Sequence, residues 1–289
     1  MKIFMMMTGR KHTAKCHRRN KGRQTINLKA YIQSDKKLEP HNHNFFIARH
    51  GFREMGFETV PFHDYDTLQE SRLEDIVVGY VGTVRKRLKD FGILPEEMDY
   101  PAELQQYMGR KVWNSTINEI NCNPELWPVF VKSVEDKKFT GVVVRSPKDL
   151  IGCGDCYENT PVICSEVLEL KREWRVFVRY GEILDVRPYK GDWKYDQYDP
   201  AVISEAVAKF SASPAGYGID FGITSDDRTV LVEVNDGYAI GSYGLDAIAY
   251  AKLLSARWAE LTGTEDECDF DGRGKYYLKQ LAKRNVGNQ

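Results

Sequence analysis

The sequence predicts an α+β protein that carries a small α/β domain near its N-terminus. Between residues 27 and 100, apolar runs of strand length alternate with stretches of helical spacing, which is typical of a small, mostly parallel sheet. Later in the chain, short strand-like runs follow one another, and residues 217–237 have the alternation of a β-hairpin. A chain of 289 residues can bury a sizeable core and divide into two or three lobes.

The N-terminal part of the chain is expected to alternate strands and helices. In order, the expected elements are a strand at 28–32, a helix at 44–55, strands at 57–62 and 76–79, and a helix at 81–91. Gly56 and Gly92 end the two helices, because glycine adopts the left-handed conformation of a helix C-terminus without steric cost. The turn at 79–82 is no phosphate loop, since it lacks the further glycines and the lysine.

The remainder of the chain is expected to be richer in strands. In order, the expected elements are a helix at 101–120, strands at 129–132, 138–144, 162–170, 173–179 and 183–189, a helix at 202–210, the hairpin, and a helix at 247–261. The last helix carries an apolar stripe, which is most simply explained as core packing.

The hairpin at 217–237 has one apolar face and one polar face. With the turn at residues 226 and 227, the expected apolar pairs are Ile219 with Val234, Phe221 with Val232 and Ile223 with Val230. On the other face Asp220 lies opposite Glu233, and Gly218 lies opposite Asn235. Two carboxylates therefore face each other across the strand pair, which destabilises it by up to about 1 kcal/mol.

This pair of carboxylates permits two interpretations. The simpler one is a solvent-facing hairpin whose polar side merely carries charge. The other is a site for a hard cation, because carboxylate and amide oxygens are the ligands that Mg²⁺ accepts beside nucleotide phosphates. Asp236 and Gly237 close the strand, and a glycine-rich loop at 240–244 follows where a ligand can lie. These flanks favour the cation site.

Three basic residues lie at strand positions upstream of the hairpin. Lys132 ends an apolar strand and Lys138 opens the next, positions from which two ammonium groups can reach one polyphosphate. Arg175 shares a face of its strand with Glu173 and Phe177, so we expect it to be held in place. Taken singly, each lysine is more often an ordinary strand-end residue, and the arginine has the alternative of an exposed salt bridge worth little.

The charge of the chain is unevenly distributed. Residues 1–34 contain nine Lys or Arg and no acidic residue, so the remaining residues carry 32 basic and 42 acidic side chains, a net charge of −10. An acidic body is a poor general binder of nucleic acid, whereas the basic tail is able to contact phosphates. We interpret the tail as a disordered extension, with nucleic-acid contact and a targeting presequence as the alternatives.

The cysteines and the hydropathy indicate a protein of the cytoplasm. Six cysteines form no recognisable disulfide framework in a chain of this size. Cys153 and Cys156 form a lone CxxC with only Cys164 nearby, which falls short of the four ligands of a zinc site, so a turn is the simpler interpretation. We find no transmembrane span, and the apolar run at 3–7 is too short for a signal peptide.

Four short segments, taken in order, resemble the ATP-grasp clade that is named for one arginine and two lysines. The segments are PVFVK at 128–132, KFTG at 138–141, EWR at 173–175 and VEVNDG at 232–237. Each alone is weak, but the ordered set is specific, and the resemblance covers about residues 28 to 262. It implies a nucleotide held between two α+β lobes, behind a small α/β domain. The implied divisions are 1–26 (basic tail), 27–100 (α/β domain), 101–168 (first lobe), 169–264 (second lobe) and 265–289 (charged tail).

The resemblance also implies roles for particular residues. For ATP, it implies phosphate contacts from Lys132 and Lys138 and adenine contacts from the linker residues Glu166, Val167 and Leu168. Glu173 and Arg175 are further expected nucleotide-binding residues. For Mg²⁺, it implies Asp220, Glu233 and Asn235, with Arg175 and Lys138 stabilising the phosphoryl group in transfer. One departure is Gly218, because many relatives carry an arginine two residues before the first metal aspartate. Arg175 or Arg187 is the candidate replacement.

The reaction implied is ATP-dependent ligation of a carboxylate and an amine through an acyl phosphate. We expect a small molecule or a peptide as acceptor, bound by the loops at 188–194 and 236–244 with Lys190, Asp236 and Tyr243 as contacts. Lys190 is nearly as well explained as a solvated loop lysine. Two other functions fit the same residues: a nucleotide-responsive binding protein whose basic tail contacts nucleic acid, and a kinase that phosphorylates a hydroxyl group.

Overall fold

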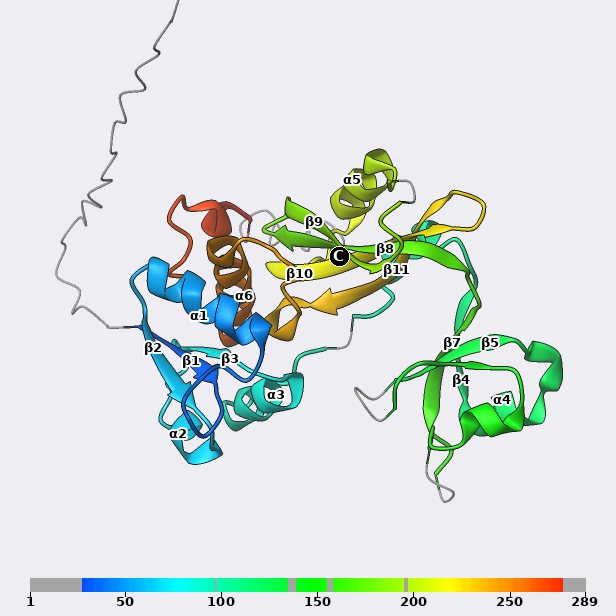
Figure 1. Cartoon of the computed structure of the whole chain (residues 1–289), viewed down its shortest axis with the longest axis horizontal. Helices are drawn as coiled ribbons and strands as arrows, with labels where there is room; N and C mark the ends of the chain where they lie inside the picture. Colours follow the sequence, from blue (N-terminus) through cyan, green and yellow to red (C-terminus); the bar gives the residue numbers. More distant parts are fainter. Residues whose placement is uncertain (1–27, 97, 135–138, 155–157, 195–196, 278–289) are drawn as a thin grey trace, which may run out of the picture.

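A computed structural model describes residues 28–277 apart from 97, 135–138, 155–157 and 195–196 (Figure 1). The expected basic tail at 1–26 lies outside the described residues, as do Lys138 and Cys156. The described chain forms three sheets, with strand orders β2-β1-β3, β4-β7-β5-β6 and β11-β10-β8-β9. None of its helices is long and apolar enough to cross a membrane.

The first sheet is parallel, as the β/α alternation predicts. Its elements are β1 (Lys29–Gln33), α1 (His43–Glu54), β2 (Glu58–Phe62), α2 (Tyr65–Gln69), β3 (Ile76–Val78) and α3 (Val81–Asp90). Strand β1 lies in the middle and pairs in parallel with β2 and β3. Helix α1 begins where the Asn42 side chain accepts a hydrogen bond from the Phe45 amide, and Gly56 with φ +85° follows its end.

The last long helix of the chain completes the core of this N-terminal domain. Helix α6 (Ala247–Thr262) packs beside α1 (Figure 1). Its Tyr250 and Trp258 are buried in one cluster with Ile32 and Phe52, and each fully buried side chain of this size stabilises the fold by roughly 1.5–3 kcal/mol. The two ends of the described chain therefore share one hydrophobic core.

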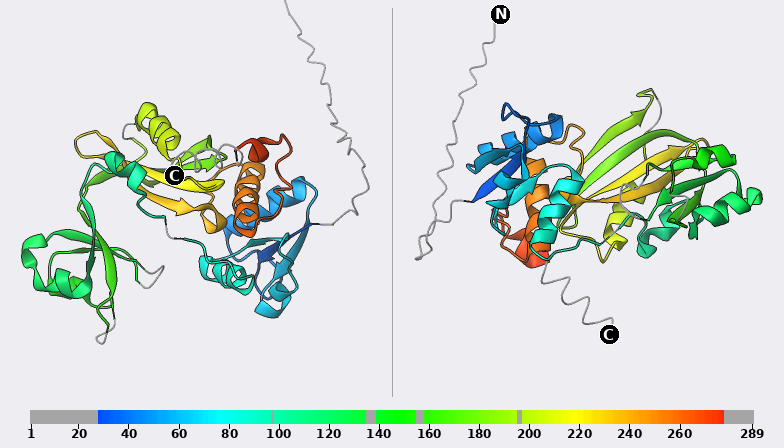
Figure 2. Two further views of the ribbon diagram at one scale, coloured as in Figure 1. Left: turned by 180° about the vertical axis from the view of Figure 1, so that it is seen from behind. Right: turned by 90° about the horizontal axis from the view of Figure 1, so that it is seen from below.

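The second sheet forms a lobe that stands apart from the rest of the molecule in Figure 1 and in the left view of Figure 2. Its elements are β4 (Val112–Thr116), α4 (Ile117–Cys122), η2 (Pro124–Leu126), β5 (Val129–Ser133), β6 (Val142–Val144), η3 (Pro147–Leu150) and β7 (Pro161–Glu166). All strand pairs are antiparallel, and the lobe has its own core around Ile120, Val131 and Cys164.

The prediction of one helix over residues 101–120 is wrong. The segment instead forms η1 (Ala102–Tyr107), the strand β4 and the short helix α4. Gly109 has φ +61°, which interrupts any helix at that point, and Val112 to Thr116 pair with β7. The apolar residues of this segment have helical spacing, but pairing of β4 with a strand 45 or more residues away stabilises the extended conformation more. Tertiary structure therefore overrides the local preference.

The third sheet lies between the N-terminal domain and the separate lobe (Figure 1). It contains β8 (Leu170–Arg179), β9 (Glu182–Gly191), β10 (Gly216–Thr224) and β11 (Thr229–Asp236), all antiparallel. The helix α5 (Pro200–Lys209) and η1 cover one face, where Ile203 and Phe210 pack on Val176 and Ile219. The turn η4 (Gly237–Ala239) follows β11. Two strands were predicted longer than they are. Of the range 138–144, only β6 is a strand, and the range 162–170 is divided between β7 and the start of β8.

The hairpin register is partly as expected. Asp220 pairs with Glu233, Ile219 with Val234 and Gly218 with Asn235, which confirms the polar face. A bulge after Asp220 then shifts the register, so that Phe221 pairs with Leu231 and Ile223 with Thr229, and the two apolar pairs expected beyond this point are wrong. The bulge places one extra residue in β11 directly beside Glu233, which is how a strand redirects side chains near a site.

Candidate active site

Arg175 and Asp220 form a buried ion pair at the centre of the third sheet. They are register partners on β8 and β10, and Arg175 Nε and Nη2 donate to the two carboxylate oxygens at 2.8 and 2.6 Å. Burial raises the pKa of Asp220, and the guanidinium opposes that shift. Burial works to lower the pKa of Arg175, but the hydrogen bonds to Asp220 raise it, so the arginine stays charged.

Asn235 lies between the two carboxylates that face each other on the hairpin. Its Nδ2 is 3.3 Å from Asp220 Oδ2 and 3.2 Å from Glu233 Oε1. The amide thus bridges the carboxylates, and the repulsion expected from the register is relieved by neighbouring donors.

Lys132 connects the separate lobe to the third sheet. Its ammonium donates to Glu233 Oε2 at 3.0 Å and to Asp99 Oδ1 at 2.8 Å. Burial works to lower the pKa of Lys132, but the two carboxylates outweigh it and raise the pKa. Burial likewise works to raise the pKa of Glu233, but Lys132 lowers it, so both groups are charged at neutral pH.

A second group of side chains surrounds Arg175 on the side of β9. Glu173, which is buried, accepts hydrogen bonds from Tyr189 Oη at 2.8 Å and from the Lys190 ammonium. The rings of Tyr189 and Tyr243 stack with centroids 5.1 Å apart, and the Arg175 guanidinium carbon lies 5.0 Å from the Tyr243 centroid. Tyr243 has φ 42°, a strained conformation for a non-glycine residue, and such strain gathers at functional sites.

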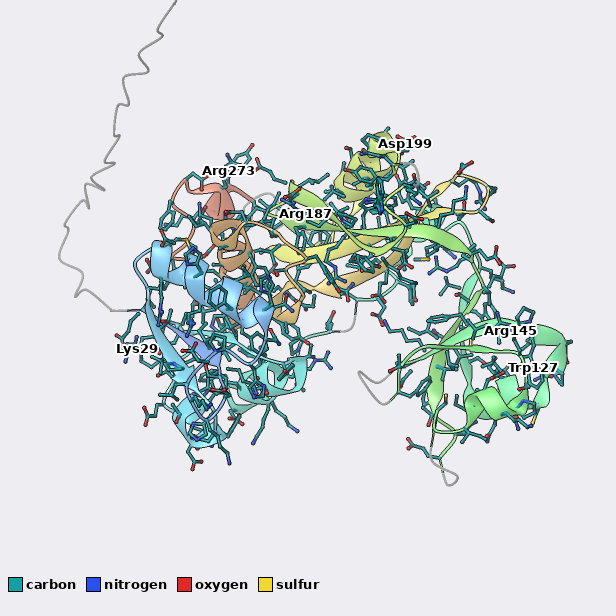
Figure 3. All side chains as sticks on the ribbon, in the orientation of Figure 1. Lys29, Trp127, Arg145, Arg187, Asp199 and Arg273 are labelled. Carbon is teal, nitrogen blue, oxygen red and sulfur yellow. The ribbon has the colours of Figure 1, made fainter. Side chains whose placement is uncertain are left out.

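The other residues expected at the site lie as follows. Glu166, at the end of β7, accepts the Lys111 amide at 2.8 Å, and Val167 and Leu168 form the connection from β7 to β8. Arg187 is the register partner of Arg175 on β9 and pairs with Asp185; its side chain is 40% exposed at the outer strand (Figure 3).

Asp236 has a partner that sequence reasoning missed. Arg257 of α6 donates to both of its carboxylate oxygens, at 2.7 and 2.6 Å. Asp236 also accepts the Tyr238 amide, so it holds the start of the loop after β11. The role expected for Asp236 toward a substrate stays a prediction, while its structural role is evident from these bonds.

Gly218 is explained by the arginine on the neighbouring strand. A Cβ atom at Gly218 would lie 3.1 Å from Arg175 Cδ and 3.2 Å from Nε. Arg175 therefore occupies the space above Gly218. Of the two candidate replacements for the missing arginine, this geometry favours Arg175 over Arg187.

The donor set fits a hard cation. The carboxylates of Asp220 and Glu233 both contact the side-chain amide of Asn235 through its Nδ2. Turning this amide over would put its Oδ1 in the place of Nδ2, so that three oxygen atoms would face one another. Such an oxygen set is the kind that Mg²⁺ accepts. Within the described residues, no group of three or more His, Cys, Asp or Glu is arranged to hold a metal, so Asn235 is needed to complete the set.

Two further residues at the site carried no usable sequence signal. Asp99 lies in the connection between α3 and η1, and its carbonyl oxygen accepts the Val234 amide on the edge of β11. Arg110 donates to the carbonyl oxygens of Leu231 and Val232 at 2.7 and 2.8 Å, which satisfies the backbone at the bulge. Both depend on contacts with residues more than a hundred positions away.

The fold and the site define an ATP-grasp protein. A family model described as the ATP-grasp domain of R2K clade family 2 matches residues 107–253, which is 147 of the 289 residues. The chain belongs to this family. No curated protein matches the sequence.

Solved structures show the same fold. The crystal structure of N5-carboxyaminoimidazole synthetase from Staphylococcus aureus has a TM-score of 0.53 at 15% identity, covering 82% of this chain and 78% of that chain. The same enzyme complexed with ADP has a TM-score of 0.51 at the same identity and coverage.

Proposed function

We propose that this protein is an ATP- and Mg²⁺-dependent ligase that joins a carboxylate to an amine through an acyl phosphate. The observation that carries the proposal is the contact of Lys132 with Glu233, which brings a cation of one lobe to the acidic residues of another. Membership of the ATP-grasp family and the fold shared with ligases support it.

The charged residues suit phosphoryl transfer, which needs positioning and charge neutralisation more than a nucleophilic side chain. Lys132 would bind phosphate oxygens, and Lys138 keeps the phosphate contact that the resemblance implies for it. Asp220, Glu233 and Asn235 would hold Mg²⁺, which when bound neutralises charge on the phosphates. Arg175 is kept charged and fixed by Asp220, so its remaining N–H groups can face the transferring phosphoryl group.

The ligation proceeds in two steps, formation of an acyl phosphate and its attack by the amine. A carboxylate oxygen of the acceptor attacks the γ-phosphorus, the bond to the β,γ-bridging oxygen breaks, and ADP leaves. The amine nitrogen then attacks the acyl carbon, the bond to the phosphate oxygen breaks, and phosphate and one proton are released. The products are an amide, ADP and phosphate, and no side chain of the enzyme is modified.

The acceptor would bind at the end of β9 and in the loop that follows β11. Tyr243 and Tyr189 form a stacked wall beside Arg175, and Lys190 is 68% exposed next to it. Because Glu173 already neutralises Lys190, an incoming carboxylate would share the ammonium rather than meet a free charge. Small molecules and peptides both suit a site built from these polar and aromatic groups.

The test is product formation. The protein is incubated with ATP, Mg²⁺ and pooled amino acids and peptides, and mass spectrometry looks for a product lighter by one water than the sum of its parts. ADP and phosphate released together with such a product support the ligase. A stable phosphorylated acceptor would instead identify a kinase, and nucleotide binding without any product would identify a binding protein.

A further inference from the structure

We propose that Asp99 is an internal competitor of the nucleotide: its carboxylate holds the Lys132 ammonium in the place of a phosphate and is displaced when the nucleotide binds. The inference rests on the proposed function, since it assumes that Lys132 binds ATP phosphates. It adds a residue outside the four segments that resemble the family, in the connection between the N-terminal domain and the first lobe.

The geometry fixes Asp99 against the site. Its carbonyl oxygen accepts the Val234 amide at 2.9 Å, which ties the backbone of the connection to the edge of β11. Val234 adjoins Glu233, so the Asp99 carboxylate is brought beside the Glu233 carboxylate. Both then accept hydrogen bonds from the one ammonium of Lys132.

The Lys132 ammonium is shared between two carboxylates. It lies 2.8 Å from Asp99 and 3.0 Å from Glu233. Glu233 is also a proposed Mg²⁺ ligand, together with Asp220 and Asn235, which it adjoins. Asp99 is not one of these proposed ligands. A carboxylate that accepts from the lysine in the position of a phosphate oxygen opposes a polyphosphate by repulsion and by occupying its donor.

The pair is also accessible enough to exchange. The side chains of Lys132 and Asp99 are 26% and 20% exposed, so the ammonium can leave Asp99 without crossing a packed core. Lys132 lies on β5 of the separate lobe, and Asp99 lies outside that lobe. Transfer of Lys132 from Asp99 to a phosphate would therefore release one of the ties between the lobe and the rest of the protein.

The test measures nucleotide affinity in the variant Asp99→Asn, which keeps the shape of the side chain and removes its charge. Titration calorimetry with ADP and with a non-hydrolysable ATP analogue, each with Mg²⁺, should show affinity increased by about twofold to fivefold, the range of an exposed ion pair. The increase should shrink at high salt, where exposed charges are screened. Asp99→Glu, which keeps the charge, should bind as weakly as the wild type.

A matched control removes a charge elsewhere in the same connection. Glu96→Gln changes an exposed residue three positions away by the same one charge, and its affinity should equal that of the wild type. Equal affinities of Asp99→Asn and wild type, with normal binding by both, overturn the role of Asp99 alone. Weaker Mg²⁺-dependent binding by Asp99→Asn overturns it in favour of a ligand role. Absence of nucleotide binding in the wild type overturns both this inference and the proposed function.

Discussion

Arg175 and Asp220 lie opposite each other on neighbouring strands, and two hydrogen bonds of 2.8 and 2.6 Å join them in a site where the side chains are only 7% and 1% exposed. Gly218 leaves room for the arginine, and Asn235 contacts the aspartate from the other side. The catalytic arginine and the first metal ligand of the proposed site are therefore one structural unit, so changes to one should affect the other.

Replacing Asp220 by Asn should destabilise the protein as well as abolish turnover. The change leaves the Arg175 guanidinium buried without a carboxylate, and breaking a buried ion pair costs about 3–5 kcal/mol of folding free energy. Urea unfolding measures the loss. As the control, Asp185→Asn removes the partner of Arg187, which is 40% exposed, and should cost less than about 1 kcal/mol. Similar losses in the two variants would contradict the structural role of the pair.

Replacing Glu233 by Gln should weaken nucleotide binding that depends on Mg²⁺. A neutral amide is a poorer ligand for a hard cation than a carboxylate, so we expect affinity for ATP with Mg²⁺ to fall about tenfold or more. Calorimetric titrations with and without Mg²⁺ separate this loss from phosphate contacts. Glu125→Gln, an exposed change in η2, provides the comparison. Equal binding by Glu233→Gln and wild type would remove the metal assignment.

Replacing Lys190 by Ala should raise the KM for the acceptor about tenfold, and leave the KM for ATP within about twofold. Lys190 contacts Glu173 beside the Tyr189 and Tyr243 rings, whereas Lys132 contacts Asp99 and Glu233. Steady-state kinetics with the acceptor found by mass spectrometry test the change. Lys194→Ala removes an exposed lysine just after the end of β9 and should have little effect. If both variants keep the wild-type KM for the acceptor, the acceptor lies elsewhere.

The buried cysteines should resist alkylation at mildly alkaline pH. Burial raises the pKa of Cys164 and that of Cys268 to about 12, so only about one thiol in ten thousand is ionised near pH 8. Cys122 is exposed. Iodoacetamide followed by peptide mass spectrometry should therefore label Cys122 before Cys164 and Cys268, which should react only after unfolding or as the pH approaches their pKa. Rapid labelling of Cys164 in the folded protein would contradict its burial.

Several features could be predicted from the sequence because they depend on local chemistry. The alternation of apolar residues within each short segment predicts the parallel sheet of the N-terminal domain. The same period of two places Asp220, Glu233 and Asn235 on one face of a hairpin, since the strands are joined by a short turn and their register follows from it. The ordered motifs around these residues indicated the family.

Only the tertiary structure decided which distant residues meet. Arg175 reaches Asp220 because β8 pairs with β10 across 45 positions, and Lys132 reaches Glu233 across 101 positions. Strand pairing at such separations depends on packing of whole lobes, which short-range propensity does not encode. The same competition replaced the expected helix at 101–120 by β4, since its residues gain more by pairing with β7, and it brought Asp99 to Lys132 without any signal in the local sequence.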